Sequence, residues 1–120
     1  MLTQTGQREM IAALVVRAPR HIAWGTSSTA PAETNTTLGA EAPEARVVGA
    51  ISTITTAHTG DTYQVVGTMT ATAARTIAEA GLFDALTAGN MYVRGVHAGE
   101  AMAANDKIEY TFRIQQRRGV

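Results

Sequence analysis

The sequence predicts a mainly β protein: a small antiparallel β-sandwich or a jelly-roll-like barrel, preceded by one short N-terminal helix. Alternating apolar and polar residues in the segment KIEYTFRIQQ (107–116) are typical of a half-buried antiparallel strand. Turn signals separate several other short apolar segments at the spacing of sandwich strands. Alanine and threonine make up about a third of the chain, and threonine favours strands.

We expect residues 1–18 to form the helix, with Thr3 or Thr5 as its N-cap. Pro19 ends it, because proline cannot continue the hydrogen-bond ladder. Four apolar residues fall on one face of this helix at helical spacing: Met10, Ile11, Leu14 and Val15.

A short strand at 21–24 is followed by the segment 25–37, whose polar composition predicts an extended loop arm. The next strand is expected at 45–57, with a bulge near Gly49 where the apolar alternation slips. It forms a hairpin with a strand at 62–73, across a turn at 58–61.

The second half of the chain adds the remaining strands. Strands are expected at 75–85 and 91–98, separated by a turn at 87–90. A loop at 99–106 then leads into the strand 107–116, and a tail at 115–120 ends the chain. The total is five or six strands in a single domain, 1–120.

Composition argues against several classes of function. The formal net charge is zero, so the basic surface typical of nucleic-acid binding is absent and we expect no direct nucleic-acid partner. No apolar run approaches the length of a membrane span, so no membrane partner is expected. The chain contains no cysteine, which excludes disulfides and thiolate metal sites.

Nor does the sequence contain a motif for catalysis. His21, His58 and His97 lie in separate segments without metal-ligand spacing, and the carboxylates show no paired arrangement. Ser27 and Ser28 lack the context of a nucleophile elbow. We therefore predict no enzyme activity and no catalytic, cofactor or metal site.

Glu79 is the most informative charged residue, because it lies in an apolar segment and, if the strand alternates regularly, shares a face with Ile77 and Gly81. A carboxylate in that position needs a partner. Three arginines are candidates for this role: Arg46, Arg75 and Arg94. We interpret Glu79 as a buried structural acid that fixes strand register.

Two aromatic residues complete the set of structural candidates. Trp24 is the single tryptophan and is interpreted as an anchor in the core or in an interface. Phe83 closes the apolar segment that contains Glu79.

Two segments together carry a resemblance to a known class of proteins: WGTSSTAP (24–31) and TIAEAGLFDA (76–85). With the residues around them they resemble structural proteins of tailed-bacteriophage virions. The similarity extends to capsid cement or decoration proteins and to the N-terminal module of phage tail-collar fibre proteins. It covers roughly Thr3 to Phe112, and the family's acid before Arg46 is either Glu41 or Glu44.

The resemblance implies a structural role in a virion assembled in the host cytoplasm. Since the chain ends soon after the module, we expect no receptor-binding fibre. The first expectation is a capsid cement protein that binds the outside of the phage head and stabilises contacts between major capsid subunits, as a homo-oligomer in the particle. The loop 25–37, with Thr26, Pro31 and Thr37, and the two termini are the expected docking arms.

Two alternatives remain open on the sequence. A tail, neck or baseplate/collar component that joins other virion proteins has the same sequence features. A small ligand-binding β domain would instead require a deep apolar pocket, which the sequence does not predict.

Overall fold

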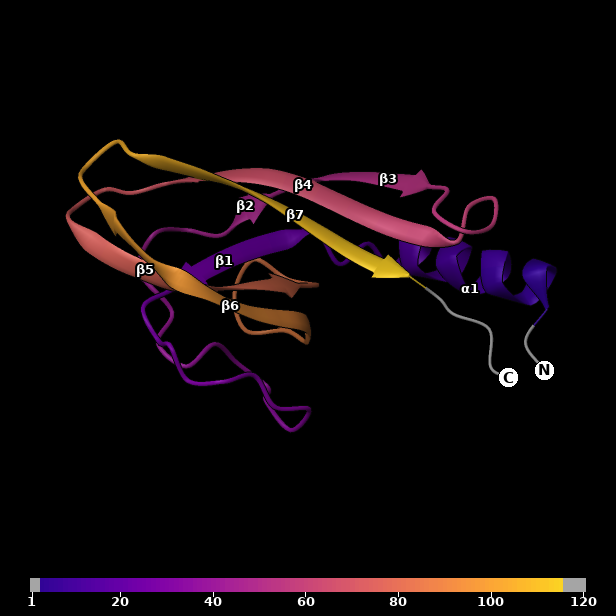
Figure 1. Ribbon diagram of the computed structural model, residues 1–120, viewed down its shortest axis with the longest axis horizontal. Coiled ribbons are helices and arrows are strands. Elements are labelled where there is room, and N and C mark those ends of the chain that lie inside the picture. The colour runs from indigo at the N-terminus through magenta and orange to yellow at the C-terminus, as the bar shows by residue number, and fades with distance from the viewer. Residues whose placement is uncertain (1–2, 116–120) are drawn as a thin grey trace.

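The structure is a computed structural model that describes residues 3–115. Within that range the chain forms one helix and seven strands (Figure 1). In chain order they are α1 (Gln4–Arg17), β1 (His21–Gly25), β2 (Val47–Val48), β3 (Ala50–Ile54), β4 (Thr62–Thr70), β5 (Arg75–Phe83), β6 (Met91–Met102) and β7 (Lys107–Gln115).

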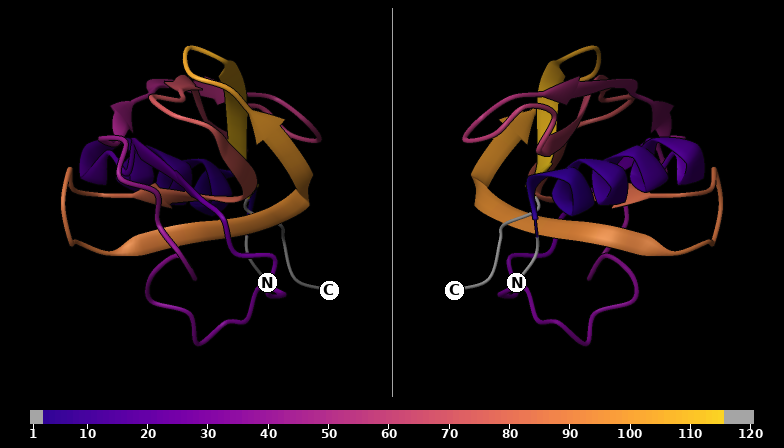
Figure 2. Two further views of the ribbon diagram at one scale, coloured as in Figure 1. Left: turned by 90° about the vertical axis from the view of Figure 1, so that its left-hand side faces the viewer. Right: turned by 90° about the vertical axis from the view of Figure 1, so that its right-hand side faces the viewer.

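The strands form two antiparallel sheets that pack as an open sandwich, which confirms the predicted fold class. One sheet has four strands in the order β2-β1-β5-β6, and the other has three in the order β3-β4-β7. The end-on views of Figure 2 show the two layers and the loop that follows β1, which extends away from both, and Figure 1 shows α1 at one end of the molecule beneath β3 and β4. The barrel alternative is not realised, because the two sheets do not close on each other.

The core lies between the two sheets. Its largest buried side chains come from both layers: Trp24, Tyr63, Ile22, Met69, Ile77, Leu82 and Val65. Trp24 is therefore a core residue in the isolated chain, which agrees with one of its two expected roles. Many neighbours of these large residues are alanine or glycine, which brings the layers close together.

The predicted strand at 45–57 is in fact two strands in different sheets. β2 pairs with β1 in one sheet and β3 pairs with β4 in the other, and Gly49 lies between them. A Cβ at this position would collide with the Val65 side chain. The slip in alternation near Gly49 thus marks a passage between layers rather than a bulge within one strand.

The predicted loop at 99–106 is also partly wrong, since β6 continues to Met102. Its last three residues pair with the start of β5, with Arg75 opposite Met102. A register shift between Ile77 and Glu79 accompanies this extension. Residues 97–101 have small or polar side chains that are mostly exposed, so the sequence shows no apolar alternation there. Backbone pairing rather than side-chain burial stabilises this part of β6.

The helix begins and ends close to the prediction, but its buried face differs. The Thr3 hydroxyl accepts a hydrogen bond from the Gly6 N–H, and Ala18 ends the helix in the left-handed conformation. The face toward the sandwich is formed by Gln7 and Ile11, with Leu14 partly buried. Of the four apolar residues assigned to one face, Ile11 and Leu14 are on the buried side, and Met10 and Val15 are exposed.

The strand at 21–24 and the hairpin of β3 and β4 are confirmed. The strand predicted at 75–85 is present as β5 and ends at Phe83, and the strand predicted at 107–116 is present as β7 to Gln115, with residue 116 outside the described range. The segment 25–37 is a loop after its first residue, which ends β1. Of the predicted tail 115–120, Gln115 belongs to β7 and the rest lies outside the described residues.

Candidate functional site

The loop between β1 and β2 is the most distinctive surface feature, and its base is organised around Glu79. Residues 26–40, here called the arm, extend away from the four-stranded sheet (Figures 1 and 2). Glu79 lies opposite Gly25 in the pairing of β1 with β5, directly below the point where the arm begins. Its side chain is fully buried.

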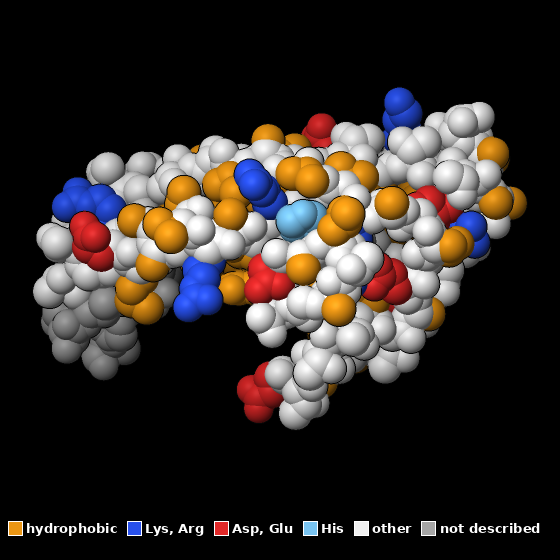
Figure 3. Space-filling view, turned by 180° about the vertical axis from the view of Figure 1, so that it is seen from behind, with side chains coloured by type: hydrophobic (Ala, Val, Ile, Leu, Met, Phe, Trp, Pro, Cys, Tyr) orange, Lys and Arg blue, Asp and Glu red, His pale blue; other side chains and the backbone are white. Residues whose placement is uncertain are grey.

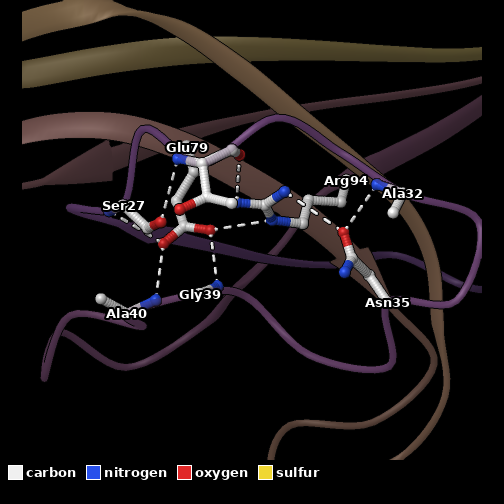
Figure 4. A network of polar contacts seen from close by, with 8 residues as sticks. Ser27, Ala32, Asn35, Gly39, Ala40, Glu79 and Arg94 are labelled. Atoms are coloured by element: carbon white, nitrogen blue, oxygen red, sulfur yellow. Dashed lines mark hydrogen bonds and ion pairs between the residues drawn. The ribbon is translucent and has the colours of Figure 1, made fainter.

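The Glu79 carboxylate holds both ends of the arm. Its oxygens accept hydrogen bonds from the backbone N–H of Ser27 at 3.1 Å, Gly39 at 2.8 Å and Ala40 at 2.8 Å (Figure 4). The first donor lies at the start of the arm and the other two at its end. One side chain of β5 thus closes a loop that spans about fifteen residues.

Arg94 of β6 completes this anchor. Its Nε lies 3.0 Å from Glu79 Oε1, and its side chain is only 4% exposed. The guanidinium also donates to the carbonyl oxygen of Thr29 at 2.9 Å and to Asn35 Oδ1 at 3.2 Å. Asn35 Oδ1 accepts the Ala32 N–H as well, so the contacts reach from the base into the middle of the arm (Figure 4).

The charge state of Glu79 follows from these contacts. Burial opposes ionisation, but three backbone N–H groups and Arg94 stabilise the carboxylate, so the pKa of Glu79 is lowered below its usual value. A carboxylate that is ionised and fully hydrogen-bonded is poorly suited to proton transfer at neutral pH. Glu79 is thus a buried, paired acid whose backbone partners belong to the arm.

Glycine at position 25 allows the arm to lie close to the sheet. A Cβ on Gly25 would collide with the carbonyl of Ala40 and with the Glu79 carboxylate. The same close approach is stabilised by two backbone hydrogen bonds, from Thr26 to Ala40 and from Ala42 to Trp24. The "WG" of the sequence motif is therefore part of the anchor.

The expected docking residues Thr26, Pro31 and Thr37 are all exposed on the arm. The arm is attached to the molecule by Leu38, which is buried against Ala23 and Phe83. These three form a small apolar cluster beside the polar anchor. The arm thus has an exposed outer part and a fixed base.

Arg46 and Phe83, two other candidates from the sequence, contact each other rather than Glu79. The Arg46 guanidinium carbon lies 3.7 Å from the centre of the Phe83 ring. Arg46 pairs with Glu41 at 3.1 Å and donates to the carbonyl of Ala85. Its contact is with the turn that follows β5, at one side of the anchor.

Arg75, the third candidate partner of Glu79, binds Glu44. Its Nε lies 2.9 Å from Glu44 Oε2. Glu44 also accepts hydrogen bonds from the Trp24 indole at 3.1 Å and from the Thr72 hydroxyl at 2.8 Å. Burial raises the pKa of Glu44, but these contacts outweigh that effect and lower the pKa to about 2. Each of the three arginines considered as partners of Glu79 therefore pairs with a different glutamate.

Asp61 is a buried carboxylate that the sequence reasoning did not single out. It accepts backbone N–H groups of Thr56, Ala57 and His58 at 2.9–3.0 Å and closes the turn between β3 and β4. Burial raises its pKa, but these bonds outweigh that effect and lower it overall. The available signal was the segment TTAHTGD, since aspartate commonly binds turn amides.

Residues 3–115 contain no cluster of three or more acidic or histidine side chains that would suit a metal ion. In the same range, no helix is long and apolar enough to cross a membrane. No protein-family model matches the chain, and a comparison with curated proteins finds no match either. A functional interpretation therefore starts from the geometry of the anchor and the arm.

Proposed function

We propose that the chain is a structural protein of a tailed-phage particle, and specifically a capsid cement or decoration protein. One observation carries the proposal: the two segments that bear the resemblance form a single structural unit. WGTSSTAP supplies Gly25 and the start of the arm, and TIAEAGLFDA supplies Glu79, which fastens that arm. Their joint occurrence has a physical reason, because neither segment holds the arm without the other.

The proposed docking element is the arm itself. Most of its exposed residues are small or hydroxyl-bearing, apart from Glu33 and Asn35, and the buried pair of Glu79 and Arg94 fixes its base. A loop with a fixed base loses less conformational entropy on binding than a free one. On the particle the arm reaches a neighbouring major capsid subunit, and many copies add their individually weak contacts.

A tail, neck or baseplate component would use the same arm but occur in few copies. Copy number is therefore the first measurement, made by quantitative mass spectrometry of purified particles against the major capsid protein. A ratio near one, or a simple fraction of one, is the expected result. A few copies per particle would indicate a tail, neck or baseplate component instead of a cement protein. Absence from particles would overturn the proposal.

The arm is tested by Pro31→Arg, with Thr68→Arg as the control. Both residues are exposed, but Thr68 lies on β4 of the opposite sheet. We expect both variants to melt like the original protein, and Pro31→Arg to reduce incorporation into particles at least tenfold because its charge and bulk block close contact. Equal incorporation of the two variants would exclude the arm as the docking element.

A further inference from the structure

The outer face of α1 is an exposed apolar surface with charged residues on both sides. Val16 is 86% exposed and Met10 is 47% exposed, and both lie on a helix whose opposite face packs on the sandwich. Ala13 lies between them and is also exposed. Figure 3 shows hydrophobic side chains gathered at the end of the molecule where α1 lies, with acidic and basic side chains beside them.

The positions on this face are symmetric about Ala13. At about 100° per residue, Glu9, Met10, Val16 and Arg17 all lie within about 60° of Ala13 around the helix axis. Met10 and Val16 are three residues before and after Ala13, while Glu9 and Arg17 are four residues before and after it. The face therefore has an acid at one end, a base at the other and a small residue at its centre.

This pattern is complementary to itself when the helix is reversed. In an antiparallel pair that crosses at Ala13, Glu9 of one helix lies at the same level as Arg17 of the other, and the same pairing recurs by symmetry. The small Ala13 side chain lets the helices approach closely at the crossing. We propose that α1 forms an antiparallel contact with α1 of a second copy of this chain.

A hollow beside the helix strengthens the proposal. It is lined by Met10, Ala13, Leu14 and Arg17 of α1 and by Tyr92 of β6. In the antiparallel pair, Met10 of the second copy lies level with this hollow and fills it. Methionine suits such a position because its flexible thioether adapts to irregular apolar surfaces.

The size of the surface predicts a weak dimer in solution. A helix of 14 residues is about 21 Å long, so one helix pair buries less area than a standard stable interface. The association is therefore expected to depend strongly on concentration. This face is distinct from the arm, and the inference does not depend on the proposed function.

The first test is the oligomeric state of the full chain, measured by sedimentation equilibrium from micromolar to millimolar concentration. We expect a monomer–dimer equilibrium that Val16→Arg weakens at least tenfold, while Pro31→Arg on the arm leaves it unchanged. A chain that stays monomeric throughout this range overturns the proposal, and so does a dimer that Val16→Arg does not affect.

Charge reversal tests the antiparallel arrangement. Glu9→Arg alone and Arg17→Glu alone each place like charges opposite each other and should weaken the dimer. The double variant restores opposite charges and should recover most of the affinity. A double variant that dimerises no better than the single ones contradicts the pairing of Glu9 with Arg17.

Cross-linking tests the crossing point, because the natural chain has no cysteine. On the two-fold axis, Ala13→Cys is close to its own copy and should form a disulfide-linked dimer under mild oxidation. Ala12→Cys is the control, since it lies on the same exposed helix but about 100° away. Cross-linking that is equal for both variants, or absent for Ala13→Cys, would contradict the geometry.

Discussion

At the scale of single residues, Glu79 shows how one buried charge organises a surface element. Its carboxylate contacts three backbone N–H groups and one guanidinium, which together satisfy the acceptor capacity of both oxygens. Buried ion pairs often add little net stability compared with apolar residues. Their value lies in specificity, because only one arrangement of the arm satisfies this carboxylate.

Glu79→Gln is expected to lower the free energy of unfolding by about 3 kcal/mol, since it leaves the Arg94 charge buried without its counter-ion. The measurement is chemical denaturation at neutral pH, together with the melting temperature. Glu109→Gln is the control because Glu109 is exposed on β7, and substitutions at exposed positions usually change stability by about 0.5 kcal/mol or less. Equal losses in the two variants would contradict the anchoring role of Glu79.

Sequence reasoning identified the buried acid but not its partner. Glu79 was recognisable because a carboxylate between Ile77 and Leu82 conflicts with its apolar neighbours. Choosing between Arg46, Arg75 and Arg94 required strand order, and Arg94 is the partner because β6 lies beside β5. Asp61 escaped notice because its ligands are backbone groups, which a side-chain motif does not contain.

At the scale of elements, the passage from β2 to β3 decides the architecture. The chain leaves one sheet at Val48 and enters the other at Ala50, so a single residue connects the two layers. Gly49 is buried there, and its N–H donates to the carbonyl of Arg20 at 2.7 Å. The sequence pattern signals this point as a slip in alternation, but it cannot distinguish a bulge from a change of sheet.

Gly49→Ala should therefore destabilise the fold by about 1–3 kcal/mol, the range expected for overpacking a dense core. The added methyl group collides with Val65 and approaches the Val66 carbonyl. Gly95→Ala is the matched control, because a Cβ on Gly95 of β6 meets nothing within 4 Å. Comparison of the two melting temperatures checks the prediction, and a Gly49→Ala variant as stable as Gly95→Ala would refute it.

The helix is a second case in which the apolar pattern does not determine the buried residues. Apolar spacing placed Met10 and Val15 on one face with Ile11, yet the buried positions are Gln7 and Ile11. α1 contains apolar residues around much of its circumference, so periodicity alone does not select the buried face. Of the apolar residues left outside, Met10 and Val16 lie on the face of the proposed helix pair.

At the scale of the whole molecule, three buried carboxylates tie distant parts of the chain together. Glu79 holds the arm, Asp61 closes the turn between β3 and β4, and Glu44 joins Trp24 to the segment before β5. All three have pKa values below their usual range, with Glu44 at about 2. These three carboxylates are therefore ionised in the folded protein at neutral pH.

The three carboxylates predict how stability depends on pH. Because their folded pKa values are depressed, the stability they contribute is fully present above the unfolded values of about 4 and is lost as pH falls through the folded values. We expect a nearly constant melting temperature from about pH 7 to 5 and a steep decrease between about pH 4 and 2. Circular-dichroism melts across this range provide the measurement, and Glu79→Gln should show a shallower acid decrease because it removes one of the titrating groups. A melting temperature that is unchanged at pH 2, or that falls mainly above pH 6, would show that other groups control the stability.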